Sequence, residues 1–237
     1  MNPQTLIEQS VPFLRYLAEW RASLPIFDLA AEIKEPERAA VVSVDLVNGF
    51  CTIGPLSSPR VQAVVAPTAR LFERAYALGI RHFVLPQDTH EPDAVEFGSF
   101  APHCVRDTQE SQTVPELTSL PFADQFIIIP KNSINSTLAP DWQDWQARHP
   151  DVHTFVVIGD CTDYCVYQLA MALRVNANSK QAREVRVIVP ADCVDTYDLP
   201  VDAAKSLGIL PHAGELIHLM FLYHMAVNGV EVVATVK

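Results

Sequence analysis

The chain has 237 residues, of which 49% are hydrophobic, and a formal net charge of −11. A chain of this length can bury one sizeable core, so we expect one main domain. The acidic balance, with no cluster of Lys and Arg, excludes a nucleic-acid groove and favours a small-molecule partner.

The N-terminal sequence MNPQTLIEQS has neither a basic start nor a long apolar run. No apolar stretch approaches the roughly 18 residues that a membrane helix requires. The five cysteines are odd in number and scattered, which predicts reduced thiols. We therefore expect a cytoplasmic protein with no membrane segment.

The predicted elements begin with residues 1–38, a helical extension followed by the charged linker EIKEPER, and continue with a main domain at 39–237. Runs rich in β-branched residues predict six buried strands, at 41–46, 82–86, 125–129, 154–158, 185–189 and 230–236. Helical patterns fill most intervals, for example 61–78, which should end at Gly79. Alternating strands and helices indicate a three-layer α/β/α sandwich with a six-stranded, mainly parallel sheet.

Three polar residues follow predicted strands. Asp45 ends the first strand, Lys131 ends the third, and Cys165 opens the helix after the fourth. Ligands of open α/β sheets bind at this edge, and a helix N-terminus favours a thiolate. Each residue has an ordinary alternative: a loop-bonded Asp, an exposed Lys, a buried Cys packed as a small apolar side chain. Together they predict a nucleophilic site.

The connection at 87–122 is long enough to suggest function. It contains two carboxylates and two imidazoles within sixteen residues, namely Asp88, His90, Glu96 and His103. This mixture suits one divalent ion, with zinc, iron and manganese as candidates. Asp93 and Glu91 are alternatives to Glu96, and a polar surface loop is the alternative to a metal site.

From about residue 39 onward the sequence resembles the isochorismatase-like cysteine hydrolases, and within them the nicotinamidase/pyrazinamidase group. The resemblance rests on five motifs: VDLVNGF with Asp45 and Phe50, DTH with Asp88 and His90, SFAPHC with His103, PKNS with Lys131, and GDCTDYCV with Cys165.

The resemblance implies a catalytic triad. Asp45 would take the thiol proton, Lys131 would complete the triad, and Cys165 would attack an amide carbonyl to form a thioester. The backbone N–H groups of Cys161 and Cys165 would form the oxyanion hole, beside a cis peptide bond between Asp160 and Cys161. Asp160 and Cys161 depart from the small apolar pair expected there.

The family also places a metal at Asp88, His90 and His103, with Glu96 as our choice of remaining ligand. That metal would hold a pyridine nitrogen, and Phe50 and Phe100 would flank the ring by stacking.

The resemblance therefore implies hydrolysis of nicotinamide to nicotinate and ammonia in NAD salvage. One alternative is another small amide or carbamoyl substrate of the same superfamily, many members of which lack the metal. A second is a non-catalytic binding module. The apolar segment 216–236 is compatible with a homo-oligomer. The remaining later histidines are expected to be structural or exposed: His153, His212, His218 and His224.

Overall fold

The computed structural model describes residues 2–237. Within them, six parallel strands follow the order β4-β3-β2-β5-β6-β8, and the short strand β7 pairs with β5. Their bounds are β2 (Ala39–Val44), β3 (His82–Asp88), β4 (Ile127–Lys131), β5 (Thr154–Asp160), β6 (Arg186–Pro190), β7 (Val194–Asp195) and β8 (Glu231–Val233). The predicted α/β fold with a mainly parallel sheet is confirmed.

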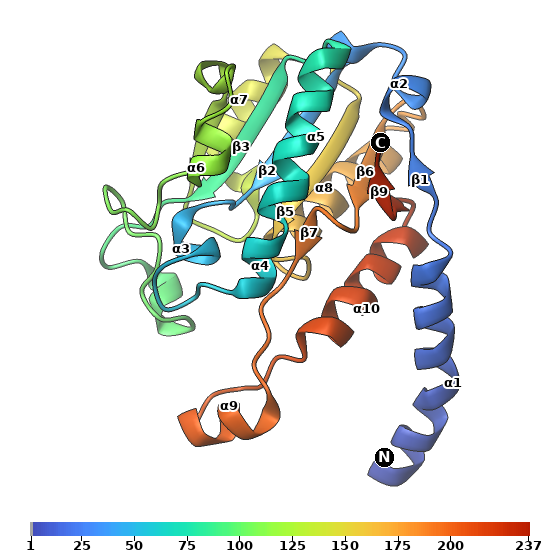
Figure 1. Cartoon of the computed structure of the whole chain (residues 1–237), viewed down its shortest axis with the longest axis vertical. Helices are drawn as coiled ribbons and strands as arrows, with labels where there is room; N and C mark the ends of the chain where they lie inside the picture. The colour runs from blue at the N-terminus through green and yellow to red at the C-terminus, as the bar shows by residue number, and fades with distance from the viewer. Residues whose placement is uncertain (1) are drawn as a thin grey trace.

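Helices cover both faces of this sheet (Figure 1). On one face lie α4 (Pro59–Ala63) and α5 (Val65–Leu78), and on the other lie α7 (Pro140–Arg148), α8 (Cys165–Ser179) and α10 (Gly214–Val227). Every residue of β2 is buried. Strands buried on both faces are apolar throughout rather than alternating, which explains the runs of β-branched residues in the sequence.

The helix predicted over 61–78 consists of two helices, because α4 ends before Val64 and α5 begins at Val65. Gly79 closes α5 with φ +111°, as the sequence predicts for a left-handed cap.

The predicted strand at 230–236 is divided between two sheets. Its first part is β8, whereas β9 (Thr235–Val236) pairs in parallel with β1 (Ile26–Phe27). Helix α1 (Pro3–Ala22) lies beside α10, where the rings of Trp20 and Tyr223 meet edge to face at 5.3 Å. The short helices α2 (Leu29–Glu32) and η1 (Pro36–Arg38) then lead into β2. The two ends of the chain are thus joined through β1 and β9.

The connections that follow the strands carry further short helices: α3 (Asn48–Cys51), η2 (Val95–Gly98), α6 (Pro115–Thr118), η3 (Ala123–Gln125), η4 (Ser136–Leu138) and α9 (Val201–Leu207). Figure 1 shows α9 on an arm that projects from the body, with α1 as a second projection. Within residues 2–237, no helix combines the length and the apolar character needed to cross a membrane.

Candidate active site

The three residues predicted to be catalytic lie together at the carboxyl ends of neighbouring strands. Asp45 follows β2, Lys131 ends β4, and Cys165 is the first residue of α8. Their exposed fractions are 0%, 3% and 6%. The Nζ of Lys131 lies 2.8 Å from Oδ2 of Asp45 and 3.5 Å from Sγ of Cys165. A carboxylate, an ammonium and a thiol therefore share one buried site.

The local backbone fixes the direction of the Asp45 side chain. Asp45 has a left-handed conformation with φ +57°, and its N–H donates to the carbonyl of Pro86 at 3.0 Å. Its Oδ1 accepts the N–H of Asp88 at 2.8 Å. Next to it, Gly159 has φ +109°, and a Cβ there would lie 1.9 Å from the carbonyl oxygen of Val44. Only glycine allows β5 to approach β2 so closely at the site.

Asp88, the last residue of β3, connects this triad to two histidines. Its Oδ1 pairs with Lys131, and its Oδ2 lies 3.5 Å from Nε2 of His90 and 3.7 Å from Nε2 of His103. Burial opposes ionisation, but the charge of Lys131 and the histidine contacts hold the pKa of Asp88 well below its usual range. Burial likewise disfavours the ammonium, yet Asp45 and Asp88 raise the pKa of Lys131 well above its usual range.

Asp45 differs electrostatically from Asp88. Burial raises the pKa of Asp45 to about 6, with a contribution from the charge of Asp88 that Lys131 partly offsets. Among residues 2–237, its Oδ2 has no aligned hydrogen bond, although Lys131 is at ion-pair distance. The acceptor atoms of Asp45 and Asp88 and the Sγ of Cys165 all lie within 4.8 Å of one another. The Asp45 carboxylate therefore lies close to the Cys165 thiol and has a raised pKa.

The thiol of Cys165 depends on this base. Burial raises its pKa well above the usual range, and the neighbouring carboxylates act in the same direction while Lys131 opposes them. The position at the start of α8 agrees with the sequence, but the surroundings favour a neutral thiol over the thiolate that a helix N-terminus alone would favour. The neutral thiol is therefore the favoured form of Cys165 in these surroundings.

Two backbone N–H groups near the thiol, those of Cys161 and Cys165, were predicted to form an oxyanion hole. The cis peptide bond implied by the resemblance is present between Asp160 and Cys161. The N–H groups of Tyr164 and Val166 both donate to the carbonyl of Cys161, at 3.1 and 3.2 Å. Within the described part of the chain, the N–H groups of Cys161 and Cys165 have no protein acceptor. They are available to a developing oxyanion, as the sequence resemblance implies.

The structure also gathers three of the four predicted metal ligands. Donor atoms of Asp88, His90 and His103 lie within 4.8 Å of one another, and all three side chains are buried. The Nδ1 of His90 faces Oδ1 of Asn132 at 2.6 Å, and the Nδ1 of His103 faces the carbonyl of Ala101 at 2.8 Å. These contacts place a proton on each Nδ1 and leave each Nε2 as a free ligand atom.

The surroundings of the Nε2 of His90 indicate whether Asp88, His90 and His103 fit a metal. This nitrogen is fully buried and lacks a hydrogen-bond partner among residues 2–237. An unpaired imidazole nitrogen beside a carboxylate and a second imidazole has the chemistry of an open coordination position.

The fourth predicted ligand, Glu96, is less buried than the other three. Glu96 lies on η2, partly exposed and outside the group of three, although its charge contributes to the raised pKa of His90. Of its rivals, Asp93 is exposed, and Glu91 pairs with Arg106 at 2.7 Å. Glu96 is the one of the three that combines partial burial with an electrostatic effect on His90.

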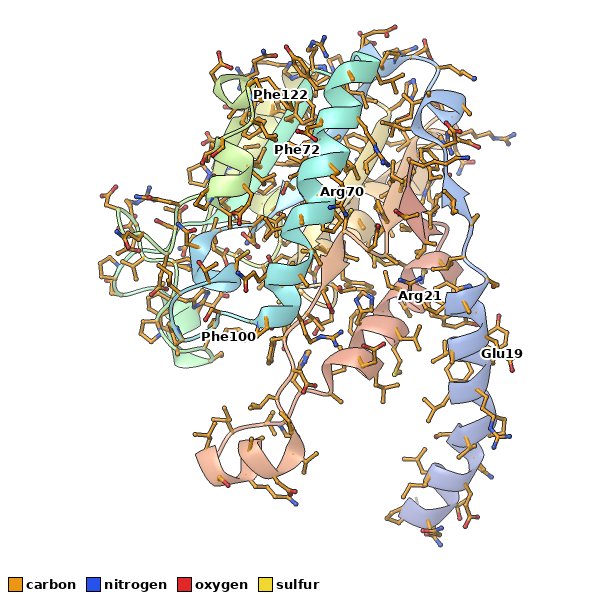
Figure 2. All side chains as sticks on the ribbon, viewed as in Figure 1. Glu19, Arg21, Arg70, Phe72, Phe100 and Phe122 are labelled. Carbon is orange, nitrogen blue, oxygen red and sulfur yellow. The ribbon has the colours of Figure 1, made fainter. Side chains whose placement is uncertain are left out.

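Aromatic rings surround His103. The ring centre of Phe50, on α3, lies 5.4 Å from that of His103, and that of Phe100 lies 6.2 Å away. Figure 2 shows Phe100 in the loop region that follows β3. Two rings that the sequence reasoning missed belong to the same cluster. The ring centre of Phe97 lies 5.4 Å from that of His90 and 5.6 Å from that of His103. The ring of Tyr164 meets that of Phe100 edge to face, with ring centres 6.0 Å apart.

The missed residues are all sequence neighbours of predicted ones. Phe97 follows Glu96, Tyr164 precedes Cys165, and Asn132 follows Lys131. Position next to a candidate ligand or nucleophile was the available signal, but spacing alone does not tell which neighbour points into the site.

A parallel α/β sandwich with a cysteine, a carboxylate and an ammonium in one buried site defines the class, an α/β cysteine hydrolase. The sequence model of the isochorismatase domain family matches residues 39–215 of this chain. Nicotinamidase 1 of Arabidopsis thaliana is 31% identical over 212 residues, which cover 83% of this chain and 86% of that protein. The chain belongs to the isochorismatase family.

Solved structures show the same architecture. The pyrazinamidase/nicotinamidase of Streptococcus mutans aligns with a TM-score of 0.66 at 19% identity, over 82% of this chain and 99% of that one. The yeast nicotinamidase bound to the inhibitor nicotinaldehyde aligns with a TM-score of 0.63 at 16% identity, over 82% and 99% of the two chains. At these identities the likeness concerns the fold.

Proposed function

We propose that this protein hydrolyses nicotinamide to nicotinate and ammonia through a thioester on Cys165, a step of NAD salvage. The observation that carries the proposal is the position of Lys131, whose Nζ contacts Asp45, Asp88 and Cys165 at once. The relative of 31% identity is named a nicotinamidase, which supports the choice of substrate.

In the first half of the reaction, the proton of the Cys165 thiol moves to Oδ2 of Asp45. The Sγ then bonds to the amide carbonyl carbon, and the carbonyl π electrons move onto its oxygen, which the N–H groups of Cys161 and Cys165 stabilise. The tetrahedral intermediate collapses by breaking the C–N bond, and Asp45 returns the proton to the leaving nitrogen. Ammonia leaves and a thioester remains.

In the second half, water replaces the nitrogen. Asp45, again unprotonated, takes a proton from water as its oxygen bonds to the thioester carbon. The C–S bond breaks, and the sulfur regains a proton from Asp45. Throughout both halves Lys131 stays charged, so it keeps Asp45 oriented and offsets the negative charge that passes through the site.

We propose Asp88, His90 and His103 as ligands of a divalent metal, with Glu96 as the remaining protein ligand. The buried, unpaired Nε2 of His90 supports this assignment. Zinc, iron and manganese all suit these donors. When bound, such an ion supplies a Lewis-acid position for a ring nitrogen.

We propose that Phe50 and Phe100 bind the pyridine ring. Phe50 is 8% exposed and Phe100 is half-buried, so each leaves some apolar surface for a ligand. Their contacts with His103 place both rings beside the proposed metal ligands. A flat aromatic amide stacked on these rings would lie beside the proposed metal ligands.

The decisive test is ammonia release by purified protein given nicotinamide, with Cys165→Ala and a chelator-treated sample in parallel. We expect release by the untreated protein and loss of release in both controls. A carbamoyl compound and a second small amide serve as comparison substrates. Release from either of these but not from nicotinamide would reject the substrate and retain the hydrolase chemistry, whereas equal release by Cys165→Ala would reject the nucleophile.

A further inference from the structure

The segment between the two proposed oxyanion donors, residues 161–164, is held by two histidines from the C-terminal part of the chain. We call this segment the nucleophile loop. Its consecutive residues Thr162 and Asp163 each bond to one histidine, His218 on α10 and His212 just before it. Neither histidine belongs to the triad or to the proposed metal group.

His212 holds Asp163. Its Nε2 lies 2.9 Å from Oδ2 of Asp163, and both side chains are only 6% exposed. Its Nδ1 faces the carbonyl of Tyr197 at 2.9 Å. Within residues 2–237, the other carboxylate oxygen of Asp163 is buried without a partner, so His212 supplies the compensation for this buried carboxylate.

The imidazole of His212 also sits in a column of rings. It stacks on Tyr197 with ring centres 3.9 Å apart and an interplanar angle of 20°. The ring centre of Tyr164 lies 6.2 Å from that of His212, with an interplanar angle of 22°. Tyr164 is the last residue of the nucleophile loop and contacts Phe100 of the proposed substrate pocket. His212 therefore packs against Tyr164 as well as bonding to Asp163.

His218 holds the other residue. Its Nδ1 lies 2.9 Å from Oγ1 of Thr162, and both residues are buried. The N–H of Thr162 donates to the carbonyl of Asp195 at 3.0 Å, and the Asp195 carboxylate is paired with Arg60 at 2.6 Å. Thr162 is thus tied on one side to α10 and on the other to β7.

We propose that His212 and His218 are positioning residues that keep the N–H groups of Cys161 and Cys165 aimed at the oxyanion, His212 through Asp163 and His218 through Thr162. Neither histidine touches the reacting atoms in this assignment. The inference rests on the proposed function, because it assigns these contacts to the stabilisation of the tetrahedral intermediate. Displacement of such donors by about 1 Å is enough to cost on the order of 100-fold in rate.

The chain allows substitutions that remove these contacts and keep the shape of the side chain. His212→Phe keeps a ring in the column but removes both ring nitrogens, and with them the contacts to Asp163 and to the carbonyl of Tyr197, whereas His212→Gln can still donate to Asp163. Thr162→Val keeps the shape of the side chain and removes only the hydroxyl. The matched control is His224→Gln, because His224 also lies on α10 and contacts α8 through the hydroxyl of Tyr167 at 3.1 Å, away from the loop.

The kinetic readout separates positioning from general stability. For nicotinamide, we expect His212→Phe and Thr162→Val to lower kcat by about 10- to 100-fold with KM changed less than about threefold, and His212→Gln to recover most of the loss. Binding of nicotinaldehyde, whose thiol adduct carries an oxygen at the same donors, should weaken in parallel with kcat. His224→Gln should match the wild type. Unchanged kcat, or equal losses in all four variants, would overturn the inference.

A second readout needs no substrate. Amide hydrogen exchange at Thr162, Tyr164 and Val166, whose N–H groups are bonded in the wild type, should accelerate by about tenfold or more in His212→Phe and Thr162→Val and not in His224→Gln. Unchanged exchange would overturn the inference whatever the substrate. Wild-type protein that releases no ammonia from nicotinamide would instead reject the proposed function, and the loop would then be judged on exchange alone.

Discussion

The Nζ of Lys131 lies 2.8 Å from Oδ2 of Asp45, and each side chain is only 1% exposed. The same ammonium pairs with Asp88. One buried cation thus balances two buried carboxylates, one of which is the proposed base and the other a proposed metal ligand. The catalytic and metal-binding halves of the site therefore depend on a single charge.

Replacement of Lys131 should reveal this dependence. We expect Lys131→Met to lower the free energy of unfolding by about 3–5 kcal/mol near pH 8, because two buried carboxylates lose their partner. The loss should shrink toward pH 5, since protonation of the carboxylates removes the uncompensated charge. Chemical denaturation at both pH values measures the effect. Lys205→Met is the control, because Lys205 and its partner Asp202 are exposed; a similar loss in both variants would contradict the prediction.

The pH dependence of catalysis should follow Asp45. Burial raises the pKa of Asp45 to about 6, and the base must be unprotonated to accept the thiol proton. We therefore expect kcat/KM for nicotinamide to rise about tenfold per pH unit below this pKa and to level off above it. Initial rates between pH 4.5 and about 8 test the prediction. Asp45→Asn should lower the rate by at least about 100-fold at every pH, and a flat wild-type profile would argue against Asp45 as the base.

Alkylation should single out Cys165. The other four cysteines also have raised pKa values through burial. The Asp160 carboxylate lies 3.7 Å from the Cys161 thiol, but Cys165 has both the Asp45 carboxylate and the Lys131 ammonium beside it. Iodoacetamide followed by peptide mass spectrometry should show Cys165 modified first. In Asp45→Asn the rate at Cys165 should fall by about tenfold or more, because the thiol loses its base. Equal rates in the two proteins would show that the thiol does not need Asp45.

Metal affinity should respond to Asn132. Because Asn132 fixes the orientation of His90, we expect Asn132→Ala to weaken binding of Zn²⁺ by about 10- to 100-fold and His90→Ala to weaken it further. Isothermal titration calorimetry on chelator-treated protein measures both. Asn135→Ala is the control, since Asn135 caps η4.

The remaining ligand can be identified in the same titration. Glu96→Gln should weaken Zn²⁺ binding more than Asp93→Asn or Glu91→Gln, because Glu96 is the least exposed of the three and acts on His90. A larger loss in either rival would move the assignment to that residue.

The fold, and the edge of the sheet at which the site lies, could be predicted from the sequence alone. Runs of β-branched residues can be buried only between two layers of helices, and right-handed crossovers then bring the carboxyl ends of the strands together. Asp45 and Lys131 end predicted strands and Cys165 follows one, so local pattern and parallel topology were enough to predict that these three share one edge. Asp88 was expected in the connection after the second strand, whereas the structure makes it the last residue of β3.

The side-chain contacts within the site could not be predicted in this way. It shows Lys131 shared between Asp45 and Asp88, the orientation of His90 by Asn132, and the ring of Tyr164 beside Phe100. These contacts join segments far apart in the chain and depend on side-chain directions that periodicity does not encode. The same holds for His212, which lies 49 residues from Asp163 in sequence and 2.9 Å from it in space. Residue type and spacing predict which edge of the sheet carries the site. Side-chain packing sets the distances between its residues and their pKa values.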